Sequence, residues 1–255
     1  MLVLLPPSEG KASGGRGAPL DLTRLSHPAL TPVRERLVGA LQTAAQADPG
    51  ALRAALACPA GEVDKDAALT SSPTMPALRR YTGVVYEALS YADLSPTGRR
   101  RANASLRVAS ALFGLLSPRD PVPAYRLSAG TALPGVVPLA AAWRPVLEPE
   151  LAPHRLVVDL RSGPYAALAR VPHAVAVRVL RDTGGIRTVV SHDNKWTKGR
   201  LARALCEGGG RSLADVAEAG RSVADRVEVD GQRIDLVLFG LATARTATGP
   251  CASVG

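Results

Sequence analysis

Lysine is scarce in this chain, and the positions that it occupies indicate chemistry. Of the 31 basic residues only four are lysine, and the other 27 are arginine. Arginine keeps its charge at any physiological pH, whereas the ammonium group of lysine can lose a proton and become a nucleophile. We therefore expect some of the lysines to be kept for their shape or their chemistry, in a sequence that otherwise uses arginine for positive charge.

Three of the four lysines fall in compact, polar strings. Lys11 ends the string PPSEGK, and Lys195 and Lys198 lie in HDNKWTKG at 192–199, which holds one of only two asparagines and one of only two tryptophans. We predict that Lys11 and Lys198 bracket an anionic or carbonyl-bearing ligand as amine nucleophile or general base. His192 would then be available for proton transfer.

The remaining lysine has a simpler explanation. Lys65 lies between Asp64 and Asp66, a spacing typical of a surface ion pair. An alternative extends this explanation to all four lysines, since surface lysines need no special reason. The unusual composition of the two strings favours a site instead.

A proline-rich segment offers further candidates for ligand binding. Residues 117–127, SPRDPVPAYRL, contain three prolines, which fix backbone angles and remove hydrogen-bond donors. We predict a stiff, extended loop that holds a ligand through Arg119, Asp120, Tyr125 and Arg126. The alternative is a buried pair between the first arginine and the aspartate that only orders the loop.

A strand predicted at 155–160 leads into a second group of polar residues. It is followed by a turn that contains Ser162 and then by a helix over 165–170. Free N–H groups at a helix start, just after a strand, are a common location for binding groups in α/β proteins. Ser162 and Tyr165 are therefore candidate ligand contacts.

The 192–198 string should follow a hairpin directly. The apolar alternation at 174–181 and 186–191, separated by DTGG, predicts two antiparallel strands. We expect a helix to begin with Thr197 as its cap and to carry Arg200. A last hairpin is predicted from the strands at 227–229 and 234–239.

The earlier part of the chain predicts one strand and several helices. Proline, glycine and capping residues mark where these elements begin and end. In order they are a strand at 2–5, a loop at 11–19, and helices that begin at Thr31, after Asp48, at Thr74 with an apolar face through Leu89, and at Ser95. The last of these helices carries Arg99, Arg100 and Arg101 in its first turns, where positive charge opposes the helix dipole. These arginines need a nearby anion or acidic side chain, unless they form only a solvated face.

Composition narrows the class of protein. The net charge of +9 and the pI near 10.1 favour an anionic partner, although abundant arginine and alanine suggest that part of this charge is compositional. The chain shows no signal peptide and no apolar run of membrane-spanning length, so we expect a soluble, cytoplasmic protein. The three cysteines and four histidines lack the spacing of a disulfide framework or a metal site, and we expect neither a metal nor a cofactor.

The alternation of helices and strands predicts the fold. We expect a single mixed α/β domain over 1–240, with a mixed sheet, C-terminal antiparallel hairpins and surrounding helices. The tail at 241–255 is predicted to be disordered. The helical or strand spacing of Tyr81, Tyr86 and Phe113 assigns them to the core.

Taken in order, the motifs resemble one family. Its similarity to this chain covers PPSEGK, YTGVVY at 81–86, the block ALFGLLSP at 111–118 continuing through Asp120 to AYRL at 124–127, residues 159–165, and 195–199. This order resembles the YaaA family of peroxide stress proteins. The resemblance implies a cytoplasmic protein with a compact mixed α/β fold that binds double-stranded DNA and limits oxidative DNA damage.

Some residues of this chain match functional positions of the family, and others depart from the family's pattern. Lys11, Tyr125 with Arg126, Ser162 with Tyr165, and Lys198 with Gly199 match family positions. Ser128 stands where glutamate is frequent, Ala124 where proline is, and Asp159 where asparagine is common. The family's helix-hairpin-helix element has no clear counterpart, and residues 48–50 are the nearest candidate.

Two classes of function remain open. The first is a stress protein that contacts the phosphates of duplex DNA. The second is a lysine-dependent enzyme, of lyase or hydrolase type, that acts on a nucleobase, a nucleotide or damaged DNA. In either case we predict one shared pocket that binds DNA or an anionic small molecule. Its members are Lys11, Lys198 and His192 as catalytic candidates, with Ser8, Glu9, Arg119, Asp120, Tyr125, Arg126, Ser162, Tyr165, Lys195 and Arg200 as binding residues.

Overall fold

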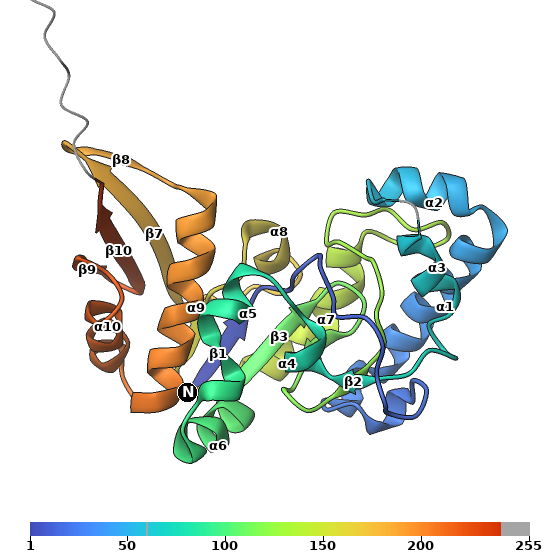
Figure 1. Cartoon of the computed structure of the whole chain (residues 1–255), viewed down its shortest axis with the longest axis horizontal. Coiled ribbons are helices and arrows are strands. Elements are labelled where there is room, and N and C mark those ends of the chain that lie inside the picture. The colour runs from blue at the N-terminus through green and yellow to red at the C-terminus, as the bar shows by residue number, and fades with distance from the viewer. Residues whose placement is uncertain (60, 241–255) are drawn as a thin grey trace, which may run out of the picture.

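A mixed sheet organises the chain in the computed structural model, which describes residues 1–59 and 61–240 (Figure 1). The tail predicted over 241–255 lies outside the described residues. The strand order is β4(Gly114–Leu116), β3(Leu106–Ser110), β1(Leu2–Leu5), β6(Val157–Asp159), β7(Val175–Thr183), β10(Arg233–Phe239) and β9(Arg226–Asp230), with β8(Ile186–Thr188) paired to β7.

The centre of the sheet is parallel and its edges are antiparallel. β1 pairs in parallel with β3 and β6, β6 with β7, and β7 with β10. All four side chains of β1 are buried, as expected for a parallel strand that is covered on both faces. β8 and β9 add antiparallel pairs to β7 and β10, so both predicted C-terminal hairpins are confirmed.

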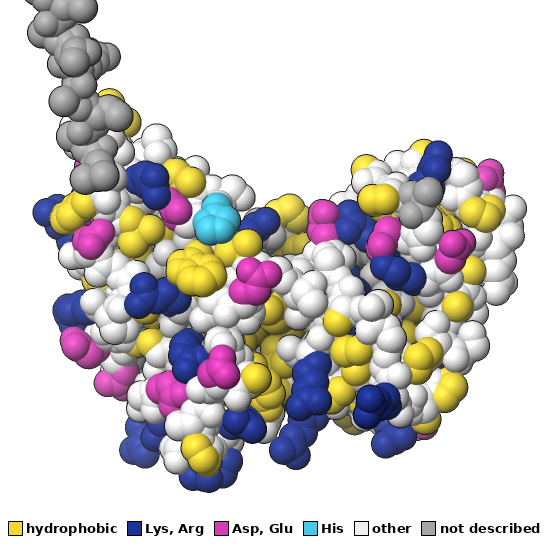
Figure 2. All heavy atoms as spheres, in the orientation of Figure 1, with side chains coloured by type: hydrophobic (Ala, Val, Ile, Leu, Met, Phe, Trp, Pro, Cys, Tyr) yellow, Lys and Arg dark blue, Asp and Glu magenta, His cyan; other side chains and the backbone are white. Residues whose placement is uncertain are grey.

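Helices cover this sheet and also pack at the two ends of the molecule. Figure 1 shows α1 to α3 at one end of the molecule, and α9 and α10 with β7 to β10 at the other. Figure 2 shows that the surface between the two ends is hollowed. The helices are α1(Thr31–Ala47), α2(Pro49–Leu56), α3(Glu62–Ala67), α4(Ala77–Arg80), α5(Val84–Leu89), α6(Pro96–Ser105), α7(Leu139–Leu151), α8(Gly163–Ala166), α9(Ser191–Gly208) and α10(Leu213–Arg221). The mixed α/β fold in one compact domain is as predicted.

The helix predicted from Thr74 to Leu89 is wrong, because tertiary pairing interrupts it. Residues Met75–Pro76 form strand β2, which pairs with β5(Pro121–Val122) in a separate small sheet. The chain then makes the short helix α4, leaves helical geometry at Tyr81, and passes Gly83 at φ +95° before α5 begins. Tyr81 forms an isolated antiparallel bridge with Lys11, which holds this segment extended.

The start of α9 also differs from the prediction. The helix begins at Ser191, six residues before the predicted cap, and Thr197 is buried inside it. β8 ends at Thr188, so the polar string continues directly into helix. Lys195 is therefore a helical residue and does not precede the helix, whereas Lys198 is helical as predicted.

The arginine-rich start of α6 is compensated as the helix dipole requires. The side chain of Glu207 accepts a hydrogen bond from Ser95 N at 2.9 Å, and also accepts one from the Ser95 hydroxyl. Its carboxylate lies at the positive end of α6 and offsets the unfavourable position of the arginines. Arg101 donates to the carbonyl oxygen of Glu207 and closes the contact between α6 and α9.

Neither a membrane-spanning helix nor a metal site is found in the described part of the chain. Within residues 1–59 and 61–240, no helix has both the length and the apolar character needed to cross a membrane. In the same part of the chain, no group of three or more His, Cys, Asp or Glu side chains is placed to hold a metal ion.

Gly199 makes the packing of α9 on α5 possible. A Cβ at this position would overlap the carbonyl oxygen of Val85 and lie 2.7 Å from the Cβ of Ala88. We predict that Gly199→Ala lowers the free energy of unfolding by about 1–3 kcal/mol, the usual cost of overpacking. Gly208→Ala is the matched control, because it lies in the same helix and its Cβ would meet nothing within 4 Å. Urea unfolding of both variants measures the difference, and equal effects would contradict this packing role.

Candidate functional site

Lys11 is enclosed by aromatic rings and by its own loop. After β1 the chain bends at Glu9 and then pairs with the Tyr81 segment through Lys11. The Lys11 Nζ atom lies 4.2 Å from the centre of the Tyr125 ring and 5.4 Å from that of Tyr81. It donates to the carbonyl oxygens of Ser8 at 3.2 Å and Glu9 at 3.4 Å.

This environment makes the amine of Lys11 unusually acidic. Its pKa is lowered to about 7, mainly by burial and also by the positive charge of Arg126, while the negative charge of Asp66 opposes both effects. A substantial share of the amine is therefore neutral near pH 7. A neutral amine is a nucleophile or a base, which is the chemistry predicted for this lysine.

Asp66 is the buried acid near Lys11 that the sequence analysis missed; its charge acts on the amine, although the two form no ion pair. Its side chain is fully buried, and one carboxylate oxygen accepts a hydrogen bond from Arg126 N at 2.7 Å. The other oxygen, Oδ2, has no hydrogen-bond partner among the described residues. Burial raises the pKa of this carboxyl to about 7. The sequence did indicate that Asp66 is buried, since it lies three residues after Val63 and three before Leu69, on the apolar face of α3.

The ion pair predicted for Lys65 forms with a different acid. Lys65 pairs with Glu62, one turn earlier on α3, and not with either neighbouring aspartate. Asp64 is exposed and Asp66 points into the protein. The helical geometry decides this, because residues three apart share a face and adjacent residues do not.

A chain of hydroxyl groups supports the ring beneath Lys11. The hydroxyls of Tyr81 and Tyr125 lie 2.6 Å apart, and Ser110 Oγ lies 2.7 Å from the Tyr125 hydroxyl. Burial raises the pKa of both tyrosines well above the usual value, so their hydroxyls stay protonated. Phe113 packs edge-on against Tyr125 and fixes the ring.

Arg126 and the residues before Lys11 close one side of this group. Arg126 Nη2 donates to Glu9 Oε2 at 2.9 Å, and the Glu9 side chain is 77% exposed. The Ser8 hydroxyl donates to the carbonyl oxygen of Gly10 and accepts from Thr82 N at 3.1 Å. Ser8 therefore orders the loop, whereas the Glu9 side chain reaches solvent.

Asp120 orders its loop, but not through the arginine beside it. Its carboxylate accepts hydrogen bonds from Ser26 N at 3.0 Å, Ser26 Oγ at 2.8 Å and Ser117 N at 2.8 Å. Arg119 is exposed. The alternative of a buried pair between Arg119 and Asp120 is therefore wrong, because Asp120 bonds to Ser26 and Ser117 instead. Asp120 does order the loop, as that alternative proposed.

Lys198 belongs to a neighbouring group at the end of β6. Its Nζ atom donates to the carbonyl oxygen of Arg161 at 3.5 Å, and Arg161 Nη2 pairs with Asp159 at 2.8 Å. Burial lowers the pKa of Lys198, and Asp159 opposes this effect. Ser162 is exposed nearby, while Tyr165 is half-buried and burial raises its pKa to about 12.

His192 lies in a third group at the start of α9. Its ring stacks on Trp196 with centroids 6.5 Å apart, and both side chains border a pocket of about 290 Å³ together with Arg200. Lys195 is exposed. Among the described residues, no hydrogen bond or ion pair joins this group to Lys11.

The three groups share one edge of the sheet. Lys11 follows β1, Arg161 follows β6, and Asp193 of α9 pairs with Arg181 of β7. Because these strands are parallel neighbours, their carboxyl ends meet at the same edge, where α/β proteins bind ligands. Lys11 shares its enclosure with Tyr125 and Arg126, while Lys198 and His192 lie in separate surroundings. Joint action of the three remains a prediction.

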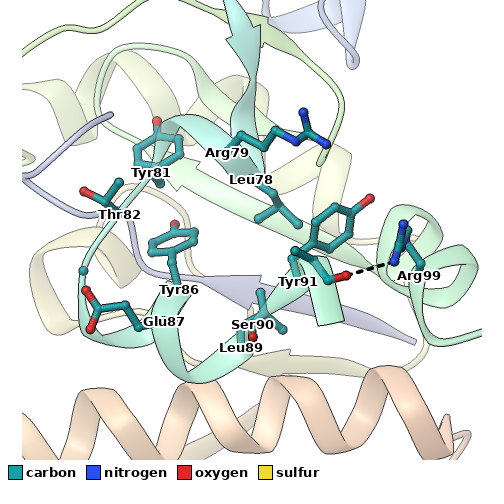
Figure 3. Close-up of a pocket in the computed structure, with 12 residues that line it drawn as sticks. Leu78, Arg79, Tyr81, Thr82, Tyr86, Glu87, Leu89, Ser90, Tyr91 and Arg99 are labelled. Carbon is teal, nitrogen blue, oxygen red and sulfur yellow. Dashed lines mark hydrogen bonds between the residues drawn. The ribbon is translucent and has the colours of Figure 1, made fainter. Parts of the chain in front are cut away.

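A larger pocket, which the sequence did not indicate to us, borders the Lys11 group. It measures about 580 Å³ and shares Tyr81 with that group (Figure 3). Figure 3 shows Arg79 and Arg99 on the side of Tyr91, with Glu87 at the opposite side. Tyr81 and Tyr86 are buried core residues, as predicted, and they also line this pocket. The available signal was the five-residue spacing of tyrosines at 81, 86 and 91.

Known proteins match this chain over most of its length. A family model described as Peroxide stress protein YaaA matches residues 1–222. UPF0246 protein CE1889 of Corynebacterium efficiens is 42% identical over 255 residues, covering 93% of this chain and 99% of that protein. UPF0246 protein SCO2297 of Streptomyces coelicolor is 44% identical over 243 residues, covering 90% of this chain and 93% of that protein.

The low pKa of Lys11 can be measured directly, because four lysines give a simple spectrum. In ¹³C-lysine NMR we expect one side chain, assigned by its loss in Lys11→Arg, to titrate near 7. Asp66→Asn should lower this pKa, because it removes the negative charge that favours the ammonium form. Arg126→Gln should raise it for the opposite reason. Titration of Lys11 near 10.5, with no response to either change, would show that the amine is ordinary.

Proposed function

This chain belongs to the YaaA family of peroxide stress proteins, and we propose that it serves this role by binding duplex DNA and limiting oxidative damage to it. The observation that carries the proposal is the pocket of Figure 3, where arginines flank a wall of tyrosines. Arginine contacts to phosphate supply most of the affinity of sequence-independent DNA binding. The net charge of +9 supports the same conclusion.

The two arginines of the pocket are suited to phosphate contacts. Arg79 is exposed on α4, and no hydrogen bond of its side chain is found among the described residues. Arg99 donates through Nη2 to the carbonyl oxygens of Ala92 at 2.9 Å and Leu94 at 3.3 Å. Because a guanidinium has five N–H donors, Arg99 is oriented by these bonds and still has donors for a ligand.

The tyrosines give the pocket a second function in DNA binding. Tyr81 and Tyr86 are stacked on each other with centroids 5.7 Å apart, and Tyr91 is held by a hydrogen bond to Asn103 at 2.8 Å. Tyr81 and Tyr86 are buried, so they support the wall, whereas the half-buried ring of Tyr91 can stack an unpaired base regardless of its identity. Glu87 at the far side would repel phosphate and confine it to the arginine side.

This arrangement favours distorted DNA over intact duplex. An unpaired or damaged base leaves the helix at low cost, whereas a paired base must first lose its stacking and pairing. Arginines on the phosphates and Tyr91 under the free base would then act together. We therefore expect little sequence preference, with tighter binding where a base is already displaced.

The salt dependence of binding tests the proposal. In gel-shift titrations of a duplex, log affinity should fall linearly with log salt concentration. Arg79→Gln should reduce that slope by roughly 0.9, the contribution of one phosphate contact. Arg36→Gln is the matched control, because Arg36 is also an exposed helical arginine but lies on α1, away from the pocket.

Two results would contradict the proposal. The first is the absence of duplex binding at low salt. The second is an identical slope for Arg79→Gln, Arg36→Gln and the unaltered protein, which would place the DNA interface elsewhere. A duplex with one displaced base should bind more tightly than the intact duplex, and Tyr91→Ala should remove this preference because the ring is lost.

A further inference from the structure

We propose that Lys11 forms a Schiff base with an aldehyde, of the kind that the ring-opened sugar at an abasic position in DNA carries, and that Asp66 donates the proton for this step. The choice of an abasic sugar as the source of the aldehyde rests on the proposed DNA function. The assignment of Lys11 as the reactive group does not depend on it. The proposal stands on the geometry around Nζ and on the free oxygen of Asp66.

The surroundings of Lys11 do not suit a purely structural cation. Its Nζ atom donates only to the Ser8 and Glu9 carbonyl oxygens, at 3.2 and 3.4 Å, which are long distances for a charged donor. Among the described residues, no carboxylate lies within ion-pair distance of it. A buried ammonium without such a partner is costly. The faces of the Tyr125 and Tyr81 rings attract an ammonium, but without a carboxylate they offset only part of this cost, so the neutral, nucleophilic form is populated.

The other lysines lack this combination. Lys65 is paired with Glu62, and Lys195 is exposed. Lys198 is buried but donates to the Arg161 carbonyl oxygen and has Asp159 as its acidic neighbour. Of these lysines, Lys11 alone combines aromatic rings against its Nζ atom with the electrostatic influence of a fully buried acid that has an unused oxygen.

Asp66 completes the chemistry of the step. The neutral amine attacks the aldehyde carbon, so that a C–N bond forms and the carbonyl oxygen becomes a hydroxyl as a proton moves from the nitrogen to it. The protonated carboxyl of Asp66 then donates its proton to this hydroxyl, the C–O bond breaks and water leaves. The products are an iminium ion on Lys11, a carboxylate on Asp66 and one water molecule. The carboxylate and the iminium ion attract each other, which favours the product.

The position of the site connects it to the DNA interface. Tyr81 lines the 580 Å³ pocket and also lies beneath Lys11. A displaced or missing base at the pocket would therefore place its sugar near the amine.

Reductive trapping tests the proposal. The purified protein is mixed with a duplex that contains one abasic position, or with free deoxyribose 5-phosphate, and treated with sodium cyanoborohydride, which reduces a Schiff base to a stable secondary amine. We expect a covalent adduct whose mass maps to the peptide that contains Lys11. Mapping on the unaltered protein keeps the test decisive even where a variant folds poorly.

Variants define the roles. Lys11→Arg keeps the charge and should abolish the adduct, whereas Lys65→Arg is the matched control and should leave it unchanged. Asp66→Asn keeps the shape but cannot donate the proton as a carboxyl does, and it should slow trapping about 100-fold, a typical effect of losing a general acid. An adduct that maps to another lysine, or an adduct that survives in Lys11→Arg, would overturn the proposal.

Gel shifts with intact duplex separate this inference from the proposed function. Duplex binding without any adduct would overturn the Schiff base and leave the DNA function standing. An adduct with deoxyribose 5-phosphate but no binding to either duplex would support the chemistry at Lys11 and assign the aldehyde to a free sugar phosphate. An adduct that forms faster on the abasic duplex than on the free sugar would support both.

Discussion

The buried guanidinium of Arg80 is the interaction on which the site depends. It donates to the carbonyl oxygens of Val122 at 3.1 Å, Gly14 at 2.8 Å and Pro73 at 3.1 Å, and also to that of Ala12. One side chain thus ties together the segment after Lys11, the strand before Tyr125 and the loop before α4. A carbonyl oxygen that is buried without a donor is costly, so these four contacts determine the path of three separate segments.

The same logic explains how the protein maintains a neutral lysine. Arg80 brings the loop of Lys11 against Tyr81 and Tyr125, and the two rings cover one side of the amine. Arg126 adds positive charge on one side, and Asp66 offsets part of it from α3. Burying an amine is unfavourable in isolation. Burial of the apolar side chains of the parallel strands around β1 stabilises the fold and offsets this cost.

Local patterns predicted the elements that local interactions form. The strand at 2–5 and the two C-terminal hairpins follow from apolar runs and glycine turns, and they are confirmed. The helix predicted from Thr74 failed because β2 pairs with β5, about 45 residues later in the chain, and because Tyr81 bridges to Lys11. The sequence of residues 74–89 does not show which distant residues will pair with it.

The sequence by itself determined which residues are candidates for chemistry: four lysines in an arginine-rich chain, with the strings around Lys11 and Lys198 standing out, and an order of motifs shared with one family. The tertiary structure alone decided which of them lie together. It placed Asp66 beside Lys11 and Tyr125 beneath it, and it gave Lys198 and His192 separate surroundings. The physical reason is that the pKa and reactivity of an amine depend on water exclusion and on charges brought from distant parts of the chain, and these exist only after folding.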